Sequence, residues 1–406
     1  MAPSGTALTA SPEAKRIAAL DALRGVAVAG IVPMNVIAFA MPASAYVNPR
    51  SFGLESGLDA ALWALSFVFI EDKFRTLFAM LFGAGVAILL ERAQGHAGAR
   101  PLAGHYARMA ALLVIALAHA IVLANNDVLR SYAVVGLALP LVVGWPARRL
   151  LMAAAAIIAA QLLVSLYFAW DWLLVWWDGT NSAALAEAER LFGADSHAIA
   201  GALERGQESF GERLTRRLAD PALQVRAVAA SIPSTLAAML IGVALWRSGL
   251  LAGSWPAPRA LALAARLAMI ALPFLIAMGA WSMASGYSPI VTAVNALVLS
   301  APFDILLGIA YAAIAMAMFE EGTWASRWAA VGRLALTNYL ATSVIFASLF
   351  ASWGLGLFGE VNRAQALALG LVPVAAMLIW SPLWLARHQR GPAEWLWRSM
   401  AAGRPV

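Results

Sequence analysis

His119 and Asp127 are the residues whose types and spacing best suit proton-transfer chemistry. His119 lies inside the apolar stretch "ALLVIALAHAIVLANNDVLRSY", and Asp127 follows it by eight positions at the end of that stretch. Histidine is the usual general base near neutral pH, and a neighbouring carboxylate fixes its tautomer. The alternative is structural: Asp127 caps the helix that follows, and His119 bonds a backbone carbonyl.

A second group of charges, Glu71 to Arg75, interrupts the stretch "FVFIEDKFRTLFAMLFGAG". No Gly, Pro or Ser run forms a loop there, so we expect a joint in a broken helix. A broken helix exposes backbone N–H groups and a positive dipole end, which would attract an anion or an oxyanion. Lys73 and Arg75 would strengthen such a site. The alternative is that the four charges simply neutralise one another.

Further polar residues lie within or beside apolar stretches, where their cost makes each a candidate for function. Asp21 and Arg24 are three positions apart and can pair on one helical face, and Asp304 needs a cationic partner such as Lys73, Arg75 or Arg130. Ion pairing and packing are the alternatives at each position. The candidate substrate-binding residues are Asp21, Arg24, Asn35, Arg108, Arg130, Asp304, Arg333 and Asn338.

Several kinds of chemistry have no support in the sequence. The chain has no cysteine and five histidines, so we predict no thiol chemistry, disulfide or metal site. The G-x-S-x-G, P-loop and dinucleotide-binding signatures are missing. Two short segments resemble each other, "MLFGAGVA" from residue 80 and "MLIGVA" from residue 239. This similarity is too short to define an internal repeat.

The elements that must position these residues are membrane helices. Hydrophobic residues make up 62% of the 406 positions and charged residues 12%, which is typical of a polytopic membrane protein. The net charge of +6 arises from Lys and Arg in short loops, where it indicates topology and not nucleic-acid binding. Apolar segments are predicted at 23–42, 57–71, 74–92, 105–124, 129–144, 149–171, 227–248, 259–283, 292–319, 332–352 and 364–386.

The basic loops predict an all-α bundle of about ten crossings with both termini cytoplasmic in a bacterial inner membrane. Residues 57–92 then cross once, yet 36 helical residues would measure about 54 Å. We therefore expect 57–71 to lie in or near the outer interface and the crossing to begin at about 74. The expected organisation is a flexible N-terminus (1–17), membrane helices (18–171), an extracytoplasmic connection with one or two amphipathic helices (172–226), membrane helices (227–388) and a cytoplasmic tail (389–406). The connection is either a solvated segment or a lid over an outward-facing cavity.

Five ordered motifs resemble those of the YeiB-like proteins, domain-of-unknown-function family 418, over residues 16 to 400. They are "RIAALDALRGVAVAGIVPMN", "DKFRTLFAMLFGAG", "ALAHAIVLANNDVLRSYAVVG", "VGRLALTNYLATS" and "GPAEWLWR". That family is grouped with multi-pass membrane acyltransferases, including the acyltransferase-three proteins and heparan glucosaminide N-acetyltransferase. The resemblance implies transfer from cytoplasmic acyl-CoA to a hydroxyl or amine across the membrane. It carries over residue by residue only to Asp21 and Arg24.

The sequence therefore predicts a membrane acyltransferase with acyl-CoA as co-substrate and an envelope saccharide or lipid as acceptor. Arg24, Arg108 and Arg333 would bind the CoA phosphates, and Asn35 and Asn338 would line a passage. His119 with Asp127 would activate the acceptor, and Lys73 or Arg75 would stabilise the oxyanion. A secondary transporter or flippase for an anionic or amphipathic molecule is the alternative. Membrane lipids and a second copy in a homodimer are the expected partners.

Overall fold

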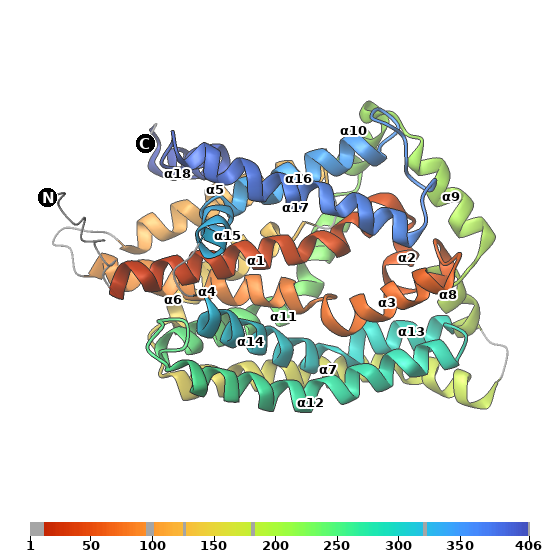
Figure 1. The fold of residues 1–406 in the computed structure, drawn as a ribbon. Helices are drawn as coiled ribbons and strands as arrows, with labels where there is room; N and C mark the ends of the chain where they lie inside the picture. The colour runs from red at the N-terminus through yellow and green to blue at the C-terminus, as the bar shows by residue number, and fades with distance from the viewer. Residues whose placement is uncertain (1–11, 95–100, 125–126, 180–182, 320–322, 405–406) are drawn as a thin grey trace, which may run out of the picture.

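The computed structural model describes residues 12–94, 101–124, 127–179, 183–319 and 323–404, and these residues form helices and connections without a strand. The long helices run side by side, and both chain termini lie at the same end of the bundle (Figure 1). Residues 1–11 of the expected flexible N-terminus lie outside the described residues, and α1 begins at Pro12.

Eight helical spans in the described residues are long and apolar enough to cross a membrane. They are α1 (Pro12–Ala40), α3 (Gly57–Phe69) with α4 (Lys73–Gln94), α5 (Pro101–Val122), α7 (Ala147–Asp178), α11 (Pro221–Arg247), α12 (Ala257–Ala284), α14 (Ala301–Met318) and α17 (Arg363–Leu385). The bent pair α15 (Thr323–Arg333) and α16 (Ala335–Phe350) makes a ninth. The shorter apolar helix α6 (Leu129–Val142) is the remaining segment of the bundle expected from sequence.

Short helices complete the described chain. They are α2 (Ala43–Val47), the 3₁₀ turn Pro49–Ser51, α8 (Ala183–Phe192), α9 (Ser196–Gly206), α10 (Phe210–Ala219), α13 (Pro289–Val294), the π-helical turn Asn295–Leu299 and α18 (Pro392–Ala402). Helices α8 to α10 form the long connection, which therefore has three helices instead of the one or two expected. The connection lies at the end of the bundle opposite the termini (Figure 1).

The joint predicted between the apolar segments of 57–92 is present. Helix α3 ends at Phe69, α4 begins at Lys73, and Asp72 between them has a left-handed φ of 58°, which is uncommon for a residue with a side chain. By length and hydropathy, the two helices nevertheless form one candidate membrane span of 36 residues, Gly57–Arg92. The joint thus interrupts the backbone without a sharp turn between α3 and α4.

A second break, which the sequence analysis did not identify, separates α15 from α16. The two helices meet at an angle of 79° at Leu334. Glu394 of α18 accepts hydrogen bonds from the backbone N–H groups of Leu336 (2.8 Å) and Thr337 (3.1 Å). The carboxylate satisfies the first turn of α16 and complements its dipole. The motif "GPAEWLWR" thus supplies a cap from a distant part of the chain.

The two similar short segments, which begin at residues 80 and 239, pack against each other. A Cβ on Gly83 of α4 would lie 2.3 Å from the Met239 carbonyl oxygen, and a Cβ on Gly242 of α11 would lie 1.8 Å from that of Met80. Each glycine therefore admits the backbone of the other helix, as small residues do between membrane helices. This contact fixes α4, which carries Lys73 and Arg75, against α11.

Candidate functional site

The predicted pair of His119 and Asp127 is formed in the structure. His119 lies in the last turn of α5, whereas Asp127 precedes α6, and His119 Nδ1 lies 3.0 Å from Asp127 Oδ1. The contact is close, although the N–H direction is not aligned as a hydrogen bond. The carboxylate therefore favours a proton on Nδ1 and leaves Nε2 as the basic atom.

Tyr339 of α16 completes this cluster. Its hydroxyl donates to Asp127 Oδ1 at 3.0 Å, and its ring centroid lies 5.4 Å from that of His119. His119 is 4% exposed, and its Nε2 has no hydrogen-bond partner among the described residues. A buried polar atom without a protein partner is costly, and a catalytic role is one explanation for it.

The first cavity next to this cluster, the terminal-end cavity, has a volume of about 320 Å³ and lies toward the chain termini. Four arginines line it: Arg24, Arg108, Arg333 and Arg398. Arg333 and Arg398 are exposed, Arg24 and Arg108 are half-buried, and Tyr339 is buried at the inner limit. The three arginines predicted to bind an anion therefore do come together, with Arg398 as a fourth that the sequence analysis missed.

Neighbouring contacts hold the walls of the terminal-end cavity. Arg24 pairs with Asp21 at 3.0 Å, and Arg333 donates to the Gln389 carbonyl at 3.4 Å. Trp397 of α18 donates its indole N–H to the Arg108 carbonyl at 2.7 Å. These bonds leave most guanidinium N–H groups available, since each guanidinium has five donors.

The second cavity, the distal cavity, has a volume of about 650 Å³ and lies under the connection α8–α10. From the membrane helices, Asn35, Asp72 and Arg75 line it. From α9 and α10 and the turn between them come four more cations: Arg205, Arg213, Arg216 and Arg217. From sequence, this connection is either a solvated segment or a lid over an outward-facing cavity, and its arginines do line a cavity.

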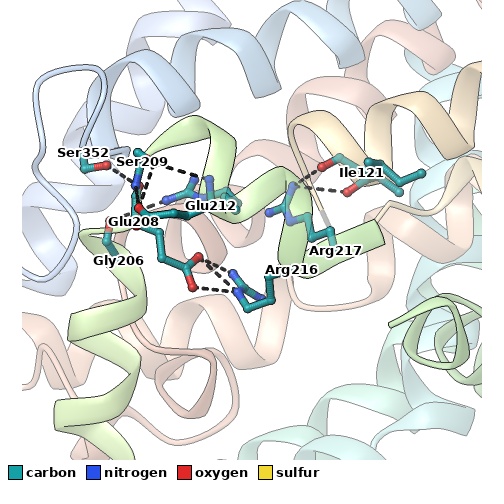
Figure 2. A network of polar contacts seen from close by, with 10 residues as sticks. Ile121, Gly206, Glu208, Ser209, Glu212, Arg216, Arg217 and Ser352 are labelled. Atoms are coloured by element: carbon teal, nitrogen blue, oxygen red, sulfur yellow. Dashed lines mark hydrogen bonds and ion pairs between the residues drawn. The ribbon is translucent and has the colours of Figure 1, made fainter. Parts of the chain in front are cut away.

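The connection is held over the distal cavity by a polar network (Figure 2). Arg216 binds both carboxylate oxygens of Glu208, with contacts of 2.7 and 3.1 Å from Nε and 2.7 Å from Nη2. Ser209 and Glu212 form a capping box at the start of α10. Arg217 donates to the carbonyls of Ala120 (3.2 Å) and Ile121 (3.0 Å), so α10 caps the end of the helix that carries His119.

The histidine cluster lies between the two cavities. On α5, residues 105, 108, 109 and 112 line the terminal-end cavity, and residues 123 and 124, just after α5, line the distal one. His119 and Asp127 lie between these two sets and line neither cavity. Val128 faces the distal cavity and Leu129 the terminal-end cavity, directly after Asp127. On α1, α4 and α16 as well, residues of one part of the helix line the terminal-end cavity and residues of the other part line the distal cavity. A histidine–carboxylate pair thus separates two basic cavities that approach it from opposite ends of the bundle.

Lys73 and Asp304 form a buried ion pair with each other. Lys73 Nζ lies 2.7 Å from Asp304 Oδ1, both side chains are almost fully buried, and Ser300 donates to Asp304 Oδ2 at 2.8 Å. Lys73 also bonds the Phe67 carbonyl across the joint. The pair therefore ties α14 to the α3–α4 joint, and Lys73 lines neither large cavity.

Two further candidates are also engaged in packing. Asn338 is fully buried, donates to the Val331 carbonyl (3.0 Å) and to Ser381 (3.1 Å), and accepts from Trp380 (2.8 Å). Arg130 bonds Gln224 of α11 and the Asp127 carbonyl. Neither residue lines either cavity. Among the residues described, no group of three His, Cys, Asp or Glu side chains is arranged to hold a metal.

The fold and the site together define a polytopic helical membrane protein with a buried histidine–carboxylate pair between two basic cavities. Residues 245–404 match the family described as "Protein of unknown function (DUF418)". The chain is 31% identical to "Uncharacterized protein YeiB" of Escherichia coli (strain K12) over 97% of its length and 98% of that protein. The chain belongs to this YeiB-like family.

A second relative is "Uncharacterized protein YxaH" of Bacillus subtilis (strain 168). It is 28% identical over 95% of this chain and 94% of its own length. An "Uncharacterized 39.9 kDa protein in amylase 3'region" of Bacillus acidopullulyticus matches 73 residues at 38% identity, which is 18% of this chain and 20% of that protein. No solved structure matches significantly.

Proposed function

We propose that the protein transfers an acyl group from cytoplasmic acyl-CoA to a hydroxyl or amine of an acceptor on the other side of a bacterial inner membrane. The observation that carries the proposal is the position of His119 and Asp127 between two basic cavities at opposite ends of the bundle. The positive-inside rule would place the termini and the terminal-end cavity in the cytoplasm.

The terminal-end cavity supplies the features that a CoA thioester requires. Its exposed Arg333 and Arg398 would bind the nucleotide phosphates, and the half-buried Arg24 and Arg108 would follow inward. A volume of about 320 Å³ accommodates the acyl-pantetheine end and leaves the nucleotide at the surface. The thioester would then lie near Tyr339 and the histidine cluster.

In the reaction, His119 Nε2 accepts the proton of the acceptor O–H or N–H, and the freed oxygen or nitrogen attacks the thioester carbonyl. The C–S bond breaks, the acyl group moves to the acceptor, and the CoA thiolate takes up the proton from His119. Of the two cations predicted to stabilise the oxyanion, Arg75 lines the distal cavity, whereas Lys73 is enclosed with Asp304. Arg75 is therefore the preferred candidate, and Tyr339 must move for the two substrates to meet.

Turnover of acyl-CoA by purified protein in nanodiscs tests this proposal. Acetyl-CoA and longer acyl-CoAs are compared for the wild type, His119→Ala and the control His197→Ala, an exposed histidine of α9. We expect saturable binding in all three and loss of turnover only in His119→Ala. Absence of acyl-CoA binding to folded wild-type protein would overturn the proposal.

The second break at Leu334 favours the alternative of a secondary transporter or flippase. Transporters commonly pair two broken helices at a central site, and Arg333 lies next to this break. The two cavities would then be alternately open ends of one pathway, with Tyr339 and Asp127 as the barrier. Acyl-CoA-independent uptake of an anion by proteoliposomes, abolished by substitution of Tyr339 or Asp127, would support this alternative over acyl transfer.

A further inference from the structure

We propose that the distal cavity binds a phosphate-bearing ligand, with the phosphate group held by Arg205, Arg213 and Arg217. Five arginines and one carboxylate, Asp72, line this cavity. Arg205 and Arg216 are exposed at its mouth, and Arg213 and Arg217 are half-buried. This excess of cations over carboxylates favours an anionic ligand, because like charges gathered in one cavity repel one another unless an anion joins them.

Two of the five arginines are already neutralised. Arg75 pairs with Asp72 at 2.7 Å, and Arg216 pairs with Glu208 at 2.7 Å. Both pairs are complete without a ligand. They leave Arg205, Arg213 and Arg217 as the candidates for binding an added anion.

The other three arginines have no ion pair among the described residues. Arg213 donates to the Gly206 carbonyl at 3.5 Å, and Arg217 uses Nη1 for the carbonyls of α5. Burial lowers the pKa of Arg217 to about 10, which leaves it charged at neutral pH. Three cations with unused N–H donors suit the several oxygens and the multiple charge of a phosphate group.

Apart from Asn35 and Tyr46, the remainder of the distal cavity is largely apolar. Side chains of α1, α4 and α16 and of the residues just after α5 line it, and they include Met34, Phe39, Phe74, Leu123 and Phe350. A ligand with a phosphate and a hydrocarbon part would satisfy both surfaces, whereas a phosphate on a smaller soluble molecule would satisfy the arginines alone. A lipid headgroup and a soluble phosphate thus share the recognition chemistry.

If the phosphate-bearing ligand is the acyl acceptor, this inference rests on the proposed acyl transfer. Binding of the ligand to the distal cavity itself requires no acyl-CoA. The experiment uses a fluorescent short-chain phosphatidic acid, with purified full-length protein in a neutral detergent. Phosphatidylcholine of the same chain length and inorganic phosphate serve as competitors. The double variant Arg205→Gln/Arg213→Gln is compared with Arg190→Gln/Arg226→Gln, which removes the same charge from exposed positions outside the cavity.

We expect wild-type protein to prefer phosphatidic acid to phosphatidylcholine at least tenfold. The cavity variant is expected to lose at least tenfold in affinity and the control variant less than twofold. Displacement by inorganic phosphate at similar concentrations identifies a soluble phosphate ligand, and failure to displace identifies a lipid. Equal binding of the two lipids, or equal losses in the two variants, overturns the phosphate site and leaves the test of acyl-CoA turnover unaffected.

Discussion

Tyr339 donates its hydroxyl hydrogen to Asp127 at 3.0 Å, across 212 positions of sequence. This bond joins α16 to the residue just before the start of α6, at the point where the terminal-end cavity ends. Asp127 also accepts from the backbone N–H of Arg130 at 3.2 Å. The carboxylate that orients His119 is therefore itself held by two donors, which reduces its freedom before any substrate arrives.

Tyr339→Phe removes that hydroxyl while keeping the ring against His119. A hydrogen bond to a charged group contributes about 1.5–3 kcal/mol, so we expect acyl-CoA turnover to fall by about tenfold or more, with acyl-CoA binding unchanged. The matched control is Tyr106→Phe, since Tyr106 is exposed on α5. A change in binding equal to the change in turnover would place Tyr339 in the CoA site instead.

The sidedness of the two cavities can be measured directly because the chain has no cysteine. Single cysteines at Ala202 and Arg398 report on the distal and terminal-end cavities, respectively. In intact cells whose outer membrane is permeabilised, a membrane-impermeant maleimide should label Ala202→Cys and spare Arg398→Cys. Labelling of Arg398→Cys after cell disruption is the control, and the reversed pattern would invert the proposed topology.

The buried pair of Lys73 and Asp304 should behave as a structural clamp. Breaking a buried ion pair from one side leaves an uncompensated charge, at a cost of about 3–5 kcal/mol. We expect Lys73→Met and Asp304→Leu each to lower thermal stability in detergent strongly, and the double variant to recover much of the loss. Purely additive losses would show that the two residues act separately, and retained stability with lost turnover would return Lys73 to the catalytic site.

Sequence alone predicted the helical bundle, the joint before Lys73 and the His119–Asp127 pair, because each depends on local spacing. It missed Tyr339 although the neighbouring Asn338 was selected. Successive helical residues point about 100° apart. Which of Asn338 and Tyr339 contacts the histidine cluster therefore depends on how α16 is rotated about its axis, and the sequence does not give that rotation. The break at Leu334 depends on a cap from Glu394, and the arginines of α9 and α10 reach a cavity through tertiary docking. Neither relation leaves a local signal.

The crossing of α4 and α11 should tolerate no added methyl group. In Gly242→Ala the new Cβ would meet the Met80 carbonyl at 1.8 Å, and backbone atoms cannot move away cheaply. We expect a loss of about 1–3 kcal/mol from overpacking, seen as a lower unfolding temperature in detergent. Gly104→Ala is the control, since nothing lies within 4 Å of its Cβ and alanine favours a helix. Equal stability of the two variants would contradict this packing.

The network that holds the connection over the distal cavity should open in acid. Hydrogen bonds from Arg216 lower the pKa of Glu208 below its ordinary value of 4.5. A lowered pKa in the folded state stabilises the contact fully above pH 4.5, and this contribution is lost as pH falls through the lowered pKa. Protection of α10 against hydrogen exchange, taken relative to the intrinsic exchange rate at each pH, should therefore fall below that pH, and Arg217 should release the end of α5.

Glu208→Gln tests whether this carboxylate is the group responsible. The variant keeps the size of the side chain and removes its charge, so the protection of α10 relative to the intrinsic exchange rate should be lower at neutral pH and nearly independent of pH down to the acid range. Glu187→Gln, on the exposed α8, removes the same charge from a pair that does not hold the connection over the cavity, and should leave the wild-type profile intact. A wild-type profile in Glu208→Gln would assign the acid opening to another carboxylate, because Glu208 would then make no pH-dependent contribution.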